Sequence, residues 1–261
     1  MLDYAQQPLT QVADEAELLS LAFDQALARL NARAVALPGG LRFAEQDAAL
    51  AADGLSYEQR IGERGLIAMR RDSLHDVCGA LMWLRWPAIK WAIHRGQYAG
   101  IQAHGPRQRS RHQQALTHLD EAGLLVVAAD ADVLEALYAH QWRTLLLEWR
   151  ERWAQARVHV LGHALLEVRA LRPHDLLAAK VIAVQAAPDT APTRIDQWVG
   201  EAILAGVAGA DPKDLPTLPL AAVPGWDARN QDPDFIASAP CFRPKPPGRV
   251  YAAPLLPNSI A

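Results

Sequence analysis

The chain has 261 residues, of which 51% are hydrophobic and 21% are charged, and its formal net charge is −3 at pH 7. This composition is that of a globular protein and excludes an intrinsically disordered chain. The small negative charge also gives no reason to expect non-specific nucleic-acid binding, which depends on cationic side chains that displace counterions from phosphates.

Cysteine usage and apolar segments bear on the cellular location. Cys78 lies in an apolar helical stretch and Cys241 in a proline-rich tail, so we expect no disulfide framework. Residues 1–12 lack the basic start and apolar run of a signal peptide. No window of about 18 residues is apolar and free of charge, so we expect no membrane span. These features predict a cytoplasmic protein without a membrane partner.

The first hundred residues are predicted to be mainly helical. We expect a flexible N-terminus at residues 1–13, helices at 14–34, 73–86 and 88–98, a short strand at 41–46, and an extended or turned stretch at 56–69. Asp14 can cap the first helix. Ser73 is a suitable cap for the second, and Pro87 should interrupt it near Trp86 because proline lacks an N–H group.

The second half alternates predicted strands and helices. Residues 115–129 predict a β-hairpin, because two apolar arms flank the turn-like residues 120–123. Beyond it we expect a long amphipathic helix at 130–156, strands at 157–161 and 178–186, and helices at 162–171 and 193–207. The whole pattern predicts an α+β fold: a helix-rich single domain over residues 1–261 with a small, mainly antiparallel sheet.

Residues 210–261 differ in composition from the rest of the chain. Eleven of the 18 prolines fall between Pro212 and Pro257. A disordered extension is one interpretation of this bias. The segment also keeps Leu218, Trp226 and Phe235, large apolar residues that a solvated tail does not need. We therefore expect an extended proline-rich arm wrapped on the domain.

A His-Asp pair, His75 and Asp76, lies in the first turn of the helix predicted to begin near Ser73. A helix N-terminus presents free N–H groups and a partial positive charge, which favour bound anions and an ionised Asp76. One interpretation makes His75 a general base or metal ligand. The other makes Asp76 a capping residue and His75 a surface side chain.

His163 and Glu167 are four residues apart and share one face of a predicted helix. They follow the strand at 157–161 through Gly162, an arrangement that often places a side chain at the end of a sheet. The pair can bind a divalent metal, although the sequence fixes no third or fourth ligand. A helix-stabilising hydrogen bond explains the pair equally well.

Two adjacent carboxylates, Asp120 and Glu121, occupy the tip of the predicted hairpin. Such pairs are usually solvent-exposed turn formers. If they instead faced His75 or His163, one of them could have a raised pKa and serve in acid–base chemistry.

A polar run that includes Tyr57, Glu58, Arg60 and Arg70 precedes the His75 helix. Arg70 can bind a carboxylate or phosphate in bidentate fashion, or it can pair with Glu58. Tyr57 and Arg60 are the other candidates for contact with a substrate.

Several short pieces of the sequence, taken in chain order, together resemble a known pattern. They are Tyr57-Glu58-Gln59-Arg60-Ile61, Arg70, His75-Asp76, Ala80-Leu81, Trp83, Pro87, Lys90, Leu116-Thr117, Asp120-Glu121, Gly123, His140, Trp142, Gly162-His163-Ala164-Leu165, Glu167, Pro219, Pro224-Gly225-Trp226 and Phe242-Arg243-Pro244. By their order and spacing, the chain resembles the bacterial family of domains of unknown function numbered 3025. The sequence departs from the family pattern at Leu74, Gly79 and Gln114. The resemblance implies no activity, since that of the family is unassigned.

Three functions stay open. The leading hypothesis is a hydrolase-like enzyme that acts on a small or phosphorylated substrate. Its catalytic candidates are the residues that coincide with family motifs: His75, Asp76, Asp120, Glu121, His163 and Glu167. A divalent metal, if bound, would use His75, Asp76, His163 and Glu167, and substrate contacts would come from Arg70, Tyr57 and Arg60. The sequence holds no serine nucleophile elbow, zinc-protease motif or phosphate-binding loop.

The two rivals need no catalytic site. One is a non-catalytic binding or scaffold protein with a Trp-rich face that is either core or partner surface, formed from Trp83, Trp86, Trp91, Trp142, Trp149 and Trp153. The other is nucleic-acid binding through the basic run of Arg107, Arg109 and Arg111, which the negative net charge disfavours.

Overall fold

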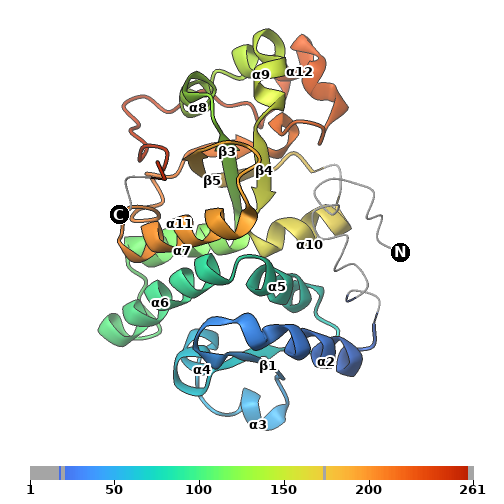
Figure 1. The fold of residues 1–261 in the computed structure, drawn as a ribbon, viewed down its shortest axis with the longest axis vertical. Helices are drawn as coiled ribbons and strands as arrows, with labels where there is room; N and C mark the ends of the chain where they lie inside the picture. Colours follow the sequence, from blue (N-terminus) through green and yellow to red (C-terminus); the bar gives the residue numbers. More distant parts are fainter. Residues whose placement is uncertain (1–17, 19–20, 173–174, 258–261) are drawn as a thin grey trace.

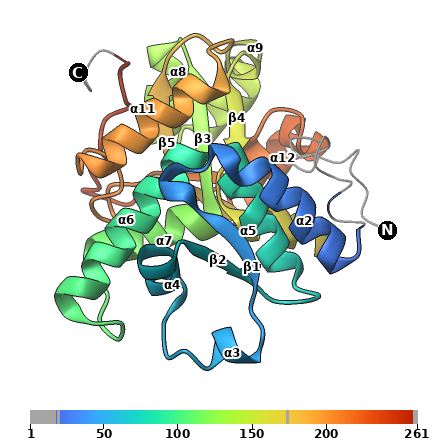
Figure 2. The same ribbon diagram turned by 60° about the horizontal axis from the view of Figure 1, so that its bottom comes forward.

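The computed structural model describes residues 18, 21–172 and 175–257. Along its long axis, a small sheet lies toward one end and a larger sheet toward the other, with a layer of helices between them (Figure 1). With the first end turned forward, the small sheet lies in front of these helices and the larger sheet behind (Figure 2). The helix layer therefore lies between the two sheets.

The small sheet pairs β1 (Arg42–Glu45) with β2 (Leu66–Met69) in parallel, so the strand predicted at 41–46 is confirmed. It is accompanied by α2 (Phe23–Arg33), α3 (Ala48–Ala51) and α4 (Tyr57–Arg64). The extended or turned stretch predicted at 56–69 is wrong over its first half, which forms α4, and confirmed over its end, which forms β2. Ser56 and Gln59 form a reciprocal capping box at the start of α4, and Gly65 ends it with φ 66°.

The helix layer contains α5 (Leu74–Arg85), α6 (Pro87–His104), α7 (Arg111–Ala122), α10 (His163–Leu171) and α11 (Pro192–Leu204). The predicted start of α5 is confirmed, since the Ser73 hydroxyl accepts a hydrogen bond from the backbone N–H of Asp76. Pro87 separates α5 from α6 as predicted, but α6 continues to His104. The helices predicted at 162–171 and 193–207 are confirmed as α10 and α11. α6 packs on α7 and α11, and α10 packs on α5 and α7.

The larger sheet contains β3 (Gly123–Ala128), β4 (Arg157–Val160), β5 (Ala178–Gln185) and β6 (Thr217–Pro219), in the order β4-β3-β5-β6. β3 is antiparallel to β4 and parallel to β5, and β5 is antiparallel to β6. Every residue of β3 is buried, which explains its unbroken apolar sequence. The predicted helix-rich α+β fold with a small, mainly antiparallel sheet is confirmed.

The hairpin predicted at residues 115–129 is wrong. Ser110 and Gln113 close a capping box that starts α7, and α7 continues through Asp120 and Glu121 to Ala122. The chain then enters β3 directly. The two carboxylates that looked like turn formers therefore lie in the last turn of a helix, and only the second arm of the predicted hairpin is a strand.

The long helix predicted at 130–156 is broken into pieces. These are α8 (Ala131–Tyr138), a π-helical turn (Thr144–Glu148) and α9 (Arg150–Ala154). His140 lies between the first two with φ 55°, a backbone conformation that a helix does not contain. The helix predicted at 14–34 is also too long, since α2 begins at Phe23. Asp14 and residues 1–13 lie outside the described residues.

The proline-rich arm packs on the domain over its described part. Leu215, Leu218, Leu220 and Val223 are buried. Farther along, the backbone N–H of Leu255 donates to Ala183 in β5 at 2.8 Å. A short helix, α12 (Pro233–Ser238), lies in the same arm. The arm, coloured orange to red in Figure 1, thus extends the edge of the larger sheet.

The tryptophans belong to the core rather than to a surface. Trp83, Trp86, Trp142 and Trp153 are each at most 6% exposed. Three of their indole N–H groups donate to backbone carbonyl oxygens, and that of Trp83 donates to the hydroxyl of Tyr57. Of the two alternatives considered for the Trp-rich face, core is therefore confirmed for these four side chains and partner surface is wrong. Over the described residues, no helix is both long and apolar enough to cross a membrane.

We expect the substitution Asp196→Ala to destabilise the protein. The Asp196 carboxylate, on α11, accepts hydrogen bonds from the backbone N–H groups of Ala88 and Ile89 at 2.9 Å each and is buried. Without it the first turn of α6 would keep two buried donors without a partner, at a cost of about 2–4 kcal/mol in the free energy of unfolding. Urea unfolding followed by circular dichroism measures this loss. The exposed Asp189→Ala is the matched control, and equal stability of both variants would contradict the prediction.

Candidate functional site

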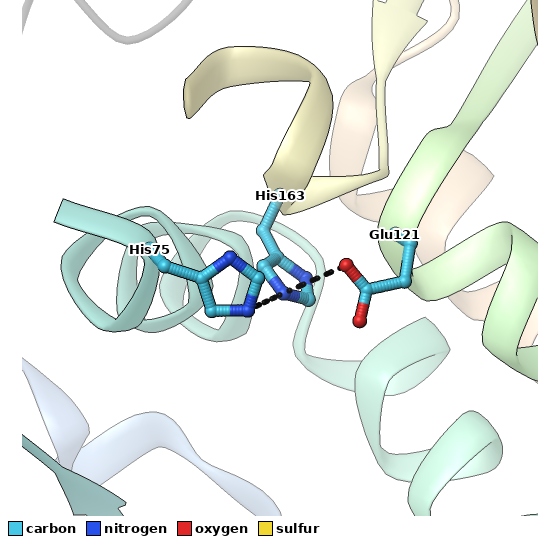
Figure 3. Close-up of side chains that lie close together, drawn as sticks. All are labelled: His75, Glu121 and His163. Carbon is cyan, nitrogen blue, oxygen red and sulfur yellow. Dashed lines mark hydrogen bonds and ion pairs between the residues drawn. The ribbon is translucent and has the colours of Figure 1, made fainter. Parts of the chain in front are cut away.

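Three helix ends meet in the layer between the two sheets. They are the N-terminus of α5 with His75, the C-terminus of α7 with Glu121, and the N-terminus of α10 with His163. Figure 3 shows the two imidazole rings close together, with the carboxylate of Glu121 pointing toward them. The residues are 46 and 42 positions apart in sequence order, so only tertiary packing brings them together.

A close backbone contact fixes two of these three ends. A Cβ atom at Gly162 would lie 2.4 Å from the backbone nitrogen of Gly123 and 2.5 Å from the carbonyl oxygen of Glu121. Only glycine permits this approach. The backbone N–H groups of Leu161 and Gly162 both donate to the carbonyl oxygen of Gly123, at 3.0 and 2.9 Å. The residue that follows Gly162 is thereby held beside the last turn of α7.

Glu167 orients the His75 ring. The Nδ1 atom of His75 lies 2.8 Å from Oε2 of Glu167, one turn along α10 from His163. A carboxylate only accepts hydrogen bonds, so Nδ1 carries the proton and donates it. Neutral His75 then has its lone pair on Nε2. The sequence also suggested a helix-stabilising hydrogen bond between His163 and Glu167. In the structure Glu167 instead contacts His75, so this hydrogen bond joins α10 to α5.

The two imidazoles face each other through their Nε2 atoms, which are 3.0 Å apart. Their ring centroids are 4.4 Å apart with planes inclined by 73°. Oε2 of Glu121 lies 3.6 Å from the same His163 Nε2 atom. One ligand atom from each of His75, Glu121 and His163 lies within 4.8 Å of the others. Two nitrogens and one carboxylate oxygen therefore converge on one point.

A buried ion pair lies behind His163. Oδ2 of Asp120 is 3.9 Å from Nδ1 of His163, and its other oxygen accepts a hydrogen bond from the Lys90 ammonium. Both the Lys90 and His163 side chains are at least nine-tenths buried. Burial lowers the pKa of His163, which favours the neutral ring. Burial alone would raise the pKa of Asp120, but Lys90 and the neighbouring His163 and His75 together outweigh it, so that pKa is lowered and Asp120 stays ionised.

The Nδ1 atom of His163 is a buried polar atom without a hydrogen-bond partner within the described part of the chain. The neighbouring Asp120 carboxylate is slightly too far away for a direct bond. A small rotation of either side chain would join them. Such an unsatisfied buried atom is uncommon and calls for an explanation from the function of the site.

Asp76 does not join this cluster. Its carboxylate accepts hydrogen bonds from the backbone N–H, Nε and Nη2 of Arg70 at 2.7, 2.9 and 2.7 Å. Burial raises the pKa of Asp76, but the hydrogen bonds from Arg70 outweigh it and the pKa is lowered. Asp76 therefore fastens the start of α5 to the end of β2, and Arg70 pairs with it rather than with Glu58.

The cluster opens into a cleft of about 480 Å³, hereafter the central cleft. Its polar lining consists of Gln46, Ser56, Tyr57, Glu58, Arg70, His75, Asp76, Lys90, Gln97, Gln108, Arg109, Gln113, Thr117, Asp120, Glu121 and His163. Arg60 is not among the lining residues, because its guanidinium is buried against Asp53 at 3.1 Å. Of the positions that depart from the family pattern, Gly79 lines the cleft, and a Cβ atom there would lie 4.0 Å from the His163 ring.

Lys90, Glu58 and His94 were not among the predicted site residues, although Glu58 and Lys90 belong to the pieces that carry the family resemblance. Nδ1 of His94, which is buried, lies 2.5 Å from Oε2 of Glu58. Burial raises the pKa of Glu58, although His94 acts against this shift. The sequence did hold one signal for a buried charge in this region. Lys90 is a charged residue between the apolar Ile89 and Trp91 in a helical stretch.

The basic run of residues 107–112 is partly engaged within the protein. Arg111 pairs with Asp211 at 2.6 Å, and Nδ1 of His112 donates to the carbonyl oxygen of Gly209 at 2.9 Å. Arg109 lies at the wall of the central cleft. The run therefore does not form one free cationic surface.

The family described as "Protein of unknown function (DUF3025)" matches residues 41–246. No curated protein and no solved structure matches the chain significantly. The comparisons thus give a family but no activity, and any function must be argued from the site itself.

We expect Gly162→Ala to separate the two chain segments that hold His163 beside Glu121. The added Cβ would have to move backbone atoms by several tenths of an ångström, at a cost of about 1–3 kcal/mol in the free energy of unfolding. Urea unfolding measures the loss. Gly79→Ala is the matched control, because nothing lies nearer than 4.0 Å to its Cβ and alanine favours the helix. A Gly162→Ala protein as stable as Gly79→Ala would contradict the close contact.

Proposed function

The chain belongs to the DUF3025 family, whose activity is unassigned, and from the geometry of its central cleft we propose that it is a metal-dependent hydrolase of small phosphorylated substrates. In this proposal His75, His163 and Glu121 bind one divalent ion, for which zinc is the best candidate. Two histidines and one glutamate are a donor set found in catalytic zinc sites, which keep a further position open for water. Asp76 and Glu167, both metal candidates from the sequence, are not ligands in it.

The single observation that carries the proposal is the approach of two imidazole Nε2 atoms to 3.0 Å. Glu167 leaves a lone pair on Nε2 of His75. If His163 is protonated on Nδ1, facing Asp120, its Nε2 also presents a lone pair, and two lone pairs repel unless a cation lies between them. Two nitrogens bound tetrahedrally to zinc at about 2.0–2.1 Å are roughly 3.3 Å apart. A small opening of the pair reaches this distance.

The neighbours of the three ligands support the same interpretation. Metal-bound histidines usually donate their other N–H group to a carboxylate, which fixes the ring and raises its basicity. Glu167 occupies that position for His75, and Asp120 can reach it for His163. The Glu121 side chain is 44% exposed and is free to rotate toward the metal. The Nδ1 atom of His163, which has no hydrogen-bond partner within the described residues, faces Asp120 on the side away from the proposed metal.

The chemistry follows from the open coordination position. A divalent ion lowers the pKa of a bound water toward neutrality and so supplies hydroxide. In the proposed reaction the hydroxide oxygen forms a bond to phosphorus, the ester P–O bond breaks, and the alcohol leaves with a proton. Arg109 and Arg70, which both line the cleft, are the guanidinium groups assigned in this proposal to the phosphate oxygens.

We expect the purified protein to bind about one zinc ion per chain. His163→Gln should remove it, and Glu167→Gln should weaken binding by about 10- to 100-fold, because Glu167 orients a ligand without being one. Metal analysis and competition with a chromophoric chelator measure both effects. His118→Gln, on the exposed face of α7, is the control. No stoichiometric metal, together with no thermal shift on adding zinc, cobalt or manganese, would exclude the metal site.

We expect the zinc-loaded protein to release phosphate from small phosphomonoesters. Glu121→Gln should reduce kcat at least about 100-fold because it removes a charged ligand of the ion. Phosphate release from a panel of sugar and nucleoside monophosphates measures the rate. The His118→Gln control should keep the wild-type rate. A metal-loaded protein that hydrolyses none of these, but cleaves carboxylic esters or amides, would refute the substrate class while leaving the metal site intact.

A further inference from the structure

We infer that a second pocket, between the proline-rich arm and the larger sheet, is a binding site for the phosphate group of a small ligand. This arm pocket has a volume of about 560 Å³ and shares no lining residue with the central cleft. Its walls come from β5, β6, the segment around His140 and residues 240–251 of the arm. The inference does not depend on the proposed hydrolase.

The lining of the arm pocket is cationic. It contains Lys180, Arg243 and Arg249, and none of its lining residues is Asp or Glu. No ion pair joins any of these three cations to a carboxylate of the described residues, whereas other arginines such as Arg111 and Arg152 are paired. Three positive charges therefore face one cavity without a negative charge in its wall, which is the electrostatic condition for binding an anion.

Each of the three cationic side chains donates to backbone carbonyl oxygens, which hold it in place, and it keeps further N–H donors for a ligand. Lys180 donates to the carbonyl oxygens of Pro212 and Leu215 at 3.0 and 3.2 Å. Arg243 donates through Nε to Pro240 at 3.1 Å, and Arg249 donates through Nη1. A guanidinium has five N–H donors, so most of them stay available. Burial lowers the pKa of Lys180 and Arg249 lowers it further, as expected for cations brought together.

A rigid aromatic wall fixes the geometry of the pocket. His140, with φ 55°, donates from Nδ1 to the carbonyl oxygen of Arg243 at 3.2 Å. Trp142 donates to the same oxygen at 2.8 Å, and the Tyr251 hydroxyl donates to Nε2 of His140 at 3.1 Å. The ammonium of Lys245 lies 5.0 Å from the centre of the Tyr251 ring and adds positive charge beside the pocket. A non-glycine residue in the left-handed region is typical of sites where surrounding contacts impose a conformation.

The charge and donor pattern favours phosphate. A phosphomonoester carries up to two negative charges and three terminal oxygens, which suit two guanidinium groups and an ammonium. The cavity is larger than phosphate alone, so a small phosphorylated molecule fits it better than the free ion. Inorganic phosphate and glycerol 3-phosphate, used as separate probes, distinguish these two sources.

The test is isothermal titration calorimetry of metal-free protein with each probe. We expect binding to wild type and to His163→Gln with equal affinity, and an affinity at least tenfold lower in the double variant Arg243→Gln/Arg249→Gln. The matched control is Arg143→Gln/Arg194→Gln, which removes the same charge from exposed positions elsewhere and should bind as wild type does. Tighter binding of glycerol 3-phosphate than of phosphate would identify the phosphorylated molecule as the ligand class.

A second measurement uses the unaltered protein, so its result does not depend on whether a variant folds. On titration of the metal-free protein with glycerol 3-phosphate, the indole N–H resonance of Trp142 and the backbone amide of Thr217 should shift in nuclear magnetic resonance spectra. Shifts of Gly79 and Thr117 would report separate binding in the central cleft. Any one of three results would overturn the inference. They are shifts confined to the central cleft, loss of binding in His163→Gln, and unchanged binding in Arg243→Gln/Arg249→Gln. Absence of binding by both probes at 10 mM, about the upper limit for a weak specific site, would do the same.

Discussion

The contact between Gly162 and the α7–β3 junction is the constraint on which the candidate site depends. Here two backbone segments approach so closely that no side chain fits between them, and the carbonyl oxygen of Gly123 accepts two hydrogen bonds. The antiparallel pairing of β3 with β4 ends at this point, and the first residue of α10 follows at once. A helix end and a strand end are thus joined by backbone atoms, which move far less than side chains. Preorganised positions of this kind are what a catalytic or metal site requires.

Buried charge surrounds this rigid point. The ion pair of Lys90 with Asp120 lines the central cleft, and so does Glu58, whose carboxylate contacts the buried His94. Buried ion pairs are poor stabilisers compared with apolar residues of the same size, because desolvation offsets most of the attraction. Their concentration beside two facing imidazoles is therefore better explained by a functional requirement than by stability, and it supports the proposed metal site.

The proline-rich arm gives the domain a second region of unusual charge. Its apolar residues complete the core along β5 and β6, which accounts for their presence in a segment otherwise rich in proline. Its basic residues meet Lys180 of β5 over a cavity with no acidic wall. One segment thus closes the hydrophobic core and also builds the arm pocket, and both follow from how an extended chain lies across a sheet edge.

The sequence by itself determined the fold class, the strands β1, β4 and β5, and the helices α10 and α11. It also determined the start of α5 at Ser73 and the interruption at Pro87. These features were predictable because caps, prolines and apolar periodicity act within a few residues. It did not determine whether residues 115–119 were helix or strand, since a run of adjacent apolar residues suits both until the capping box at Ser110 is weighed. It named His75, Glu121 and His163 as catalytic candidates, but it ranked them equally with Asp76, Asp120 and Glu167, and it offered Arg60 as a substrate contact. Only the tertiary structure separated them, by pairing Asp76 with Arg70 and Arg60 with Asp53 while it brought the three others to one point. The reason is physical: local signals fix dihedral angles, whereas the meeting of side chains far apart in the chain depends on how whole helices pack.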